Sequence, residues 1–123
     1  MKTVSERDID RLVKILDYCD KIRDCRNCFN DSYDTFSDNV IYQDAVQMSL
    51  FQIGEQANHL SDECIEQVGD VPWYQIIGLR NRIAHGYETV QSNQIWHIMV
   101  TDVPALKDAI SRFLIDIGET DLL

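Results

Sequence analysis

Apolar residues recur at helical spacing along each long segment of this chain, and that period constrains the fold more than any other feature. Between residues 5 and 29 they leave one apolar face opposite a charged one, formed by Ile9, Leu12, Ile15, Leu16, Cys19 and Ile22. Such spacing predicts an amphipathic helix. No segment shows the alternation of a half-buried strand, so we expect an all-α fold.

Capping and turn residues divide the next part of the chain. Residues 30–37 consist of turn formers without periodicity, which predicts a loop. A second helix is expected over residues 38–60, with an apolar stripe formed by Val40, Ile41, Ala45, Met48, Phe51 and Ala57. Ser61 is predicted to cap a short third helix that ends near Val68 and Gly69.

Proline and glycine bound the remaining helices. Pro72 near the first turn and Gly86 in the C′ position predict a fourth helix between them. Ser92 is expected to cap a last helix to about Ile117, which Pro104 should kink or split. Together the segments predict an up-and-down bundle of about four main helices plus a short one.

Length and charge limit the class of protein. The 123 residues suffice for a single helical domain spanning positions 1–123. The N-terminal residues are charged, and no apolar run is as long as a membrane span, so we expect a cytoplasmic protein. The net charge of −10 predicts repulsion of nucleic acid over most of the surface, so that any contact with RNA is local.

Two cysteines have the spacing of a zinc knuckle or a redox pair. Cys25 and Cys28 are separated by two residues, but no second Cys-x-x-Cys follows, and only His59 and Cys64 add ligands in the middle of the chain. Reduced thiols packed as small hydrophobic groups are the favoured interpretation. We expect no metal or other cofactor.

The most informative stretch for function is residues 80–87. It gathers two guanidinium groups, a carboxamide, an imidazole and a phenol near the expected end of the fourth helix, from Arg80, Asn81, Arg82, His85 and Tyr87. A compact cationic and titratable cluster in an acidic chain indicates a phosphate-binding site.

Arg80 and His85 lie five positions apart, which is about 140° around a helix axis, so they do not share one face. Two arrangements could bring them together. The helix could end at His85, so that the imidazole leaves the helical path. Alternatively, two protomers could face their helix ends across a symmetry axis and share a composite site, as isologous dimers allow.

This set of residues suits the cleavage of RNA, which carries its own nucleophile in the ribose 2′-hydroxyl. His85 can act as the acid or base near neutral pH, and Arg80 can stabilise the charge that develops on the phosphate. Asn81 could position the phosphate or the imidazole. Tyr87 could donate to a phosphate oxygen or stack on a base. The products would be a 2′,3′-cyclic phosphate and a 5′-hydroxyl, without a metal.

Purely structural roles are an alternative explanation for the residues of the 80–87 stretch. A histidine before a C′ glycine can simply interact with the helix dipole. Arg82 can be a solvated residue that pairs with Glu88, and Tyr87 can pack against the last helical turn.

The motif Arg80-x4-His85-x-Tyr87 resembles the signature of the HEPN superfamily in its HepT-like branch, the toxin partners of minimal nucleotidyltransferases of the MntA kind. The resemblance covers essentially the whole chain. Beyond the motif it includes Ile53–Ala57, Leu60–Glu63, Val71–Trp73, Ile76–Asn81 and Trp96–Leu106.

This resemblance implies a helical bundle that forms a homodimer, with the two motifs meeting between protomers. It also implies a metal-independent endoribonuclease toxin with Arg80 and His85 catalytic. A cognate nucleotidyltransferase antitoxin would transfer AMP from ATP onto Tyr87, adding bulk and negative charge where the substrate phosphate should lie.

Two other functions stay open at this point. A non-catalytic dimer could serve as scaffold or substrate of the nucleotidyltransferase, which the acidic composition favours. A nucleotide-binding helper of a two-part transferase is a further alternative, but the chain contains no glycine-rich phosphate loop.

Overall fold

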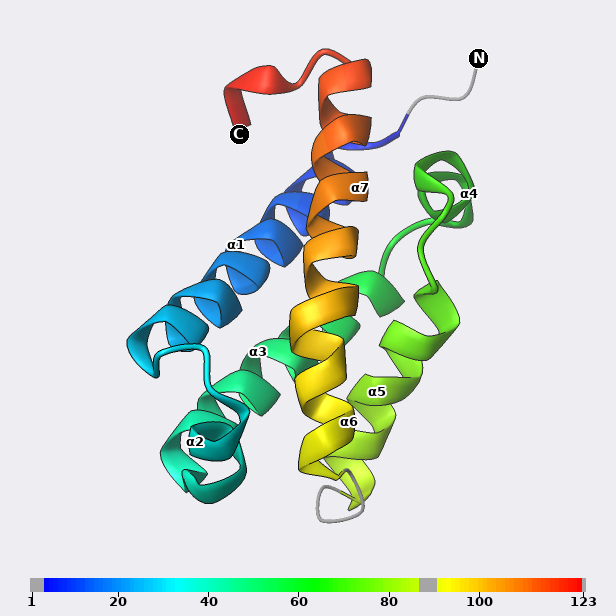
Figure 1. Ribbon diagram of the computed structural model, residues 1–123. Helices are drawn as coiled ribbons and strands as arrows, with labels where there is room; N and C mark the ends of the chain where they lie inside the picture. Colours follow the sequence, from blue (N-terminus) through cyan, green and yellow to red (C-terminus); the bar gives the residue numbers. More distant parts are fainter. Residues whose placement is uncertain (1–3, 87–90, 123) are drawn as a thin grey trace.

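The computed structural model describes residues 4–86 and 91–122, except the side chains of 84–86 and 122, and all its regular elements are helical (Figure 1). They are α1 (Glu6–Cys28), α2 (Tyr33–Asp38), α3 (Val40–Asn58), α4 (Asp62–Val68), α5 (Trp73–Gly86), α6 (Ser92–His97), a π-helical turn (Ile98–Asp102), α7 (Val103–Asp116) and a 3-10 turn (Thr120–Leu122). Within these ranges no strand occurs, which confirms the predicted all-α class. The main helices are α1, α3, α5 and the α6–α7 segment.

Helix α1 follows its prediction closely. The hydroxyl of Ser5 accepts a hydrogen bond from the backbone N–H of Asp8 at 3.1 Å and so caps the helix. The predicted apolar face is buried apart from Ile9, which is partly buried, and Leu12 and Ile15 are inaccessible to solvent. One face of this helix is apolar and the other charged, so the period alone fixes which side packs inward.

Helix α3 lies between α1 and α5 and packs against both (Figure 1). Its expected apolar stripe was wrong except for Ala57, because Val40, Ile41 and Met48 are 64%, 77% and 60% exposed. Ala45 is also exposed, and Phe51 is only partly buried. The core-facing side is instead formed by Tyr42, Val46, Leu50, Ile53 and Ala57. The helix carries apolar residues on two faces, and periodicity cannot tell which of them meets the core.

The expected loop over residues 30–37 contains a short helix, α2. Ser32 caps it by accepting a hydrogen bond from the N–H of Thr35 at 3.2 Å. Phe36 is fully buried and meets Tyr42 edge to face, with ring centroids 4.9 Å apart. Six residues are too few to show a helical period, so the turn-forming composition led to the wrong prediction.

The C-terminal helical segment is interrupted, as Pro104 predicted. Before α7, the N–H of Val103 donates to the carbonyl of Ile98, five residues back, which is the π-helical register. Pro104 then lies in the first turn of α7, where its missing N–H costs little. Ser92 is the first helical residue of α6 and does not cap it, because Gln91 occupies the cap position.

The short third helix is confirmed as α4, with the Ser61 hydroxyl accepting from the N–H of Cys64 at 3.2 Å. Gly86, expected just beyond the fourth helix, is the last residue of α5. In the part of the chain that the structure describes, no helix combines the length and apolar character needed to cross a bilayer.

Candidate functional site

The site is built where α5 crosses α3 at Gly54. A Cβ atom placed on Gly54 would lie 2.4 Å from the Cβ of Arg80 and 3.1 Å from the carbonyl oxygen of Ile76. Real Cβ atoms do not approach one another so closely, so a glycine is required for this crossing. The close approach brings Glu55, the next residue of α3, to the side chain of Arg80 on α5.

Two neighbours hold the guanidinium group of Arg80. Its Nε donates to Oε1 of Glu55 in an ion pair, and one terminal nitrogen donates to Oδ1 of Asn81 at 2.6 Å. The side chains of Arg80 and Glu55 are 30% and 27% exposed. The other carboxylate oxygen of Glu55 lies 3.9 Å from Nε2 of His59, whose side chain is 54% exposed. Arg80 and Asn81, both predicted site residues, are therefore in direct contact.

The site predicted from the sequence left Glu55 out. A glutamate in the middle of a helix usually has a solvated side chain, and its partner is 25 residues away along the chain. The available signal was the glycine before it, because a glycine inside a helical pattern often marks a close approach of another backbone.

Helix α5 continues through His85 to Gly86, so His85 lies on the helical path. The backbone of His85 is thus still helical, one residue before the end of α5. The side chain of His85 and the whole of Tyr87 lie outside the described residues. Arg82 is exposed, and its guanidinium group donates to Oε1 of Gln94 on α6 at 3.0 Å.

The arrangement gives one cationic side chain a fixed place at the surface. A guanidinium group has five N–H donors in a rigid plane, and Glu55 and Asn81 engage two of them. A group of this kind can bind a phosphate oxygen through its other donors without first being ordered.

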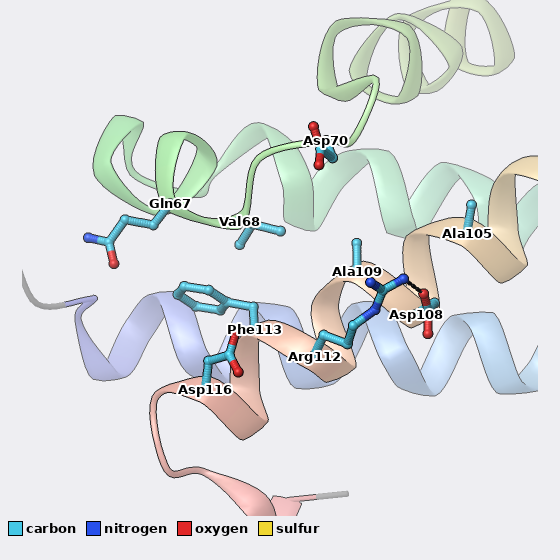
Figure 2. A pocket seen from close by; sticks show the side chains of 9 residues that line it. All are labelled: Gln67, Val68, Asp70, Ala105, Asp108, Ala109, Arg112, Phe113 and Asp116. Atoms are coloured by element: carbon cyan, nitrogen blue, oxygen red, sulfur yellow. Dashed lines mark hydrogen bonds and ion pairs between the residues drawn. The ribbon is translucent and has the colours of Figure 1, made fainter.

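A hollow of about 350 Å³ lies elsewhere, between α4 and α7, and none of its lining residues comes from α5 (Figure 2). Three carboxylates, those of Asp70, Asp108 and Asp116, border it, and its one guanidinium, Arg112, pairs with Asp108. An excess of negative charge repels phosphate. This hollow is therefore unsuited to RNA.

The cysteines do not form a ligand set. Burial raises the pKa of Cys19 and of Cys64 to about 12 in each case, which keeps both thiols protonated. Cys25 and Cys28 lie in the last turn of α1, and burial also raises the pKa of Cys25. Over residues 4–86 and 91–122, no three His, Cys, Asp or Glu side chains are grouped so as to hold a metal ion.

Fold and site together define an all-α bundle protein that carries an Arg-x4-His-x-Tyr motif starting on α5, with its arginine fixed by a carboxylate from α3. The chain belongs to the HepT-like ribonuclease family of the HEPN superfamily, because the family model described as "Ribonuclease HepT-like" matches residues 15–113.

Similar proteins carry related names. The chain is 32% identical over 78 residues to "Putative RNase MJ1380" of Methanocaldococcus jannaschii, which covers 63% of this chain and 72% of that one. It is 30% identical over 108 residues to "Putative RNase MJ0127" of the same organism, covering 87% and 89% of the two chains. No solved structure gives a significant match. The family model and both relatives are thus named as ribonucleases.

Proposed function

We propose that the protein is a metal-independent endoribonuclease toxin that acts as a homodimer and is neutralised by AMP transfer to Tyr87. In the reaction, the ribose 2′-hydroxyl attacks the adjacent phosphate and displaces the 5′-oxygen of the next nucleotide. His85 moves the protons, as base for the 2′-hydroxyl or as acid for the leaving 5′-oxygen. Arg80 stabilises the charge that builds up on the phosphate oxygens.

The observation that carries this proposal is the half-buried guanidinium of Arg80, held by Glu55 and Asn81 on the helix that also contains His85. Preorganised cationic donors stabilise a developing negative charge without reorganisation at the moment of reaction. A protein that used this helix only for structure would have no need of a neutral-pH titrating group five residues from a fixed guanidinium.

A second copy of the chain is part of the proposal, because one helix cannot present Arg80 and His85 on the same face. The surface of α3 supports it. Ile41, Met48 and Glu55 are spaced by seven residues and so follow one side of the helix, and the first two are 77% and 60% exposed. An exposed apolar stripe that leads to the Arg80 ion pair is a natural dimer surface, and symmetry would place two motifs near each other.

RNA must meet this site despite the acidic chain. Two cations of α1 are paired with carboxylates, Arg23 with Asp20 and Arg26 with Asp31. Arg82, by contrast, is exposed and donates to the neutral amide of Gln94. Arg80 and Arg82 are the cations of the motif itself, and RNA binding by so acidic a chain should be weak and strongly salt-dependent.

The test is RNA cleavage by the purified, unmodified protein in EDTA beside His85→Ala. We expect cleavage by the wild type alone, while circular dichroism shows equal helical content for both proteins. Equal cleavage by His85→Ala would refute the role of His85. Absence of cleavage by a confirmed unmodified dimer would refute the nuclease function.

Inactivation by AMP transfer fits the same site. An AMP group on Tyr87 adds negative charge two residues from His85, which would repel the RNA phosphate and block its approach. With a cognate nucleotidyltransferase and ATP, mass spectrometry should find AMP on the wild type and not on Tyr87→Phe. Modification of the Tyr87→Phe protein would show that the acceptor lies elsewhere.

A scaffold function is the second candidate, favoured by the net charge of −10 and the paired cations of α1. In that case the dimer binds the nucleotidyltransferase and is modified by it, and the purified protein cuts no RNA.

A further inference from the structure

Glu55 and Arg80 come from different helices, so their contact reports the geometry of the α3–α5 crossing. The flanking residues of α3 are fixed in the core, with Ile53 2% exposed and Ala57 fully buried. The backbone of Glu55 is therefore held on both sides, and Gly54 keeps α5 within reach. A carboxylate placed in this way defines where the Nε of Arg80 lies.

An arginine side chain that lies free at a surface has many rotamers, and ordering it during catalysis would raise the barrier. The ion pair with Glu55 is half-buried, and the contact with Asn81 restrains a second nitrogen. Both contacts are made within the chain itself. His59 adds little, because it lies 3.9 Å away and is more than half exposed.

We infer that Glu55 is a positioning residue for the phosphate-binding guanidinium of Arg80. This inference rests on the nuclease function proposed above and assigns a role outside the Arg-x4-His-x-Tyr motif. Glu55 engages Nε, so the donors left on the terminal nitrogens are the ones that would meet the phosphate.

Glu55 is negatively charged and so cannot act by attracting RNA. Its charge therefore allows a role in positioning Arg80 to be distinguished from a role in binding RNA. A carboxylate beside the phosphate site opposes RNA binding, so removing it should not weaken binding. If Glu55 positions Arg80, its loss should lower kcat and leave KM unchanged or smaller. If Glu55 only stabilised the fold, its loss would instead reduce the folded fraction of the protein, without lowering kcat relative to KM in the protein that remains folded.

The kinetic test compares Glu55→Ala, Glu55→Gln and wild type on one oligoribonucleotide. We expect kcat to fall about 10- to 100-fold in Glu55→Ala, because small displacements of a reacting group have effects of that size. Glu55→Gln keeps an oxygen acceptor and the size of the side chain, so it should retain more activity. Glu63→Gln, an exposed residue in the first turn of α4, removes the same charge and should change kcat by less than about twofold.

A spectroscopic measurement tests the contact without activity. In ¹⁵N-labelled protein, the Arg80 Nε–H resonance, assigned by its loss in Arg80→Lys, should be protected from solvent exchange. Protection should disappear in Glu55→Ala and persist in Glu63→Gln.

The outcomes distinguish the positioning role of Glu55 from the proposed nuclease function. Wild-type cleavage with equal kcat in both Glu55 variants, or an unprotected Nε–H in wild type, would overturn the positioning role alone. Wild-type protein that cuts no RNA would overturn the proposed nuclease function, whatever the resonance of Arg80 shows.

Discussion

Asp8, on the first turn of α1, ties that helix to the start of α4. It is only 4% exposed, and its carboxylate accepts from the N–H of Ser61 at 2.9 Å and from the Ser61 hydroxyl at 2.6 Å. The same hydroxyl caps α4 through Cys64. Burial by itself would raise the pKa of Asp8, but hydrogen bonds from Ser61 and Ser5 lower it below the ordinary 3.8.

Replacing Asp8 should therefore destabilise the fold. Asp8→Ala removes two charge-assisted hydrogen bonds and leaves the N–H of Ser61 without its partner, at an expected cost of about 2 kcal/mol in the free energy of unfolding. Denaturant unfolding measures it, with the exposed Asp10→Ala as control. A cost no larger than that of Asp10→Ala would show that this contact does not stabilise the protein.

The loss of stability caused by Asp8→Ala should also depend on pH. The pKa of Asp8 is lower in the folded than in the unfolded chain, so the contribution is complete above the unfolded value of 3.8 and is lost as pH falls through the folded pKa. The stability difference between wild type and Asp8→Ala should therefore be constant near neutral pH and shrink in acid. An increase of this difference in acid would contradict the lowered pKa.

The contacts of single residues also show which part of the site can be predicted from the sequence. Arg80 and Asn81 are adjacent in the motif, and their contact was within reach of a local argument. The pairing of Arg80 with Glu55 depends on the register of α3 against α5. That register is set by packing, and Gly54 marks a close approach on α3 without indicating which residue of α5 lies opposite.

Among the helices, α1 and α3 show when the period of apolar residues is sufficient to predict the buried face. Helix α1 has one apolar face, and its buried residues were predicted except Asp8. Helix α3 has two, and the predicted stripe contained Ile41 and Met48, which lie on the exposed side. Both faces are apolar for a reason under the proposed function, since one packs in the core and the other would meet a second copy.

The α3–α5 crossing predicts opposite effects at two glycines. Gly54→Ala would force a Cβ against Arg80 and should cost about 1–3 kcal/mol while displacing the guanidinium. In Gly78→Ala, on α5, the added Cβ meets nothing within 4 Å, and the change should stabilise the fold by about 0.5–1 kcal/mol. Thermal unfolding compares them. A tolerated Gly54→Ala with full activity would show that the helices can separate without harm to the site.

At the scale of the whole molecule, the exposed side of α3 decides whether the site is shared. Met48→Glu places a charge on this surface, where the native side chain is 60% exposed, so the monomer should still fold. We expect sedimentation to show a monomer with little or no cleavage activity. Ile115→Glu, at a 51% exposed position on α7, is the matched control and should remain dimeric. An active monomeric Met48→Glu protein would exclude a composite site.

The proposed mechanism requires the RNA to supply the nucleophile, and removal of a single 2′-hydroxyl tests this requirement. A cleaved oligoribonucleotide is compared with the same sequence carrying one 2′-deoxy residue on the 5′ side of the scissile bond, both in EDTA, with product ends identified by mass spectrometry. We predict a 2′,3′-cyclic phosphate from the first and no cleavage at that bond in the second. Cleavage of the deoxy bond, or products without a cyclic phosphate, would contradict the mechanism assigned to Arg80 and His85.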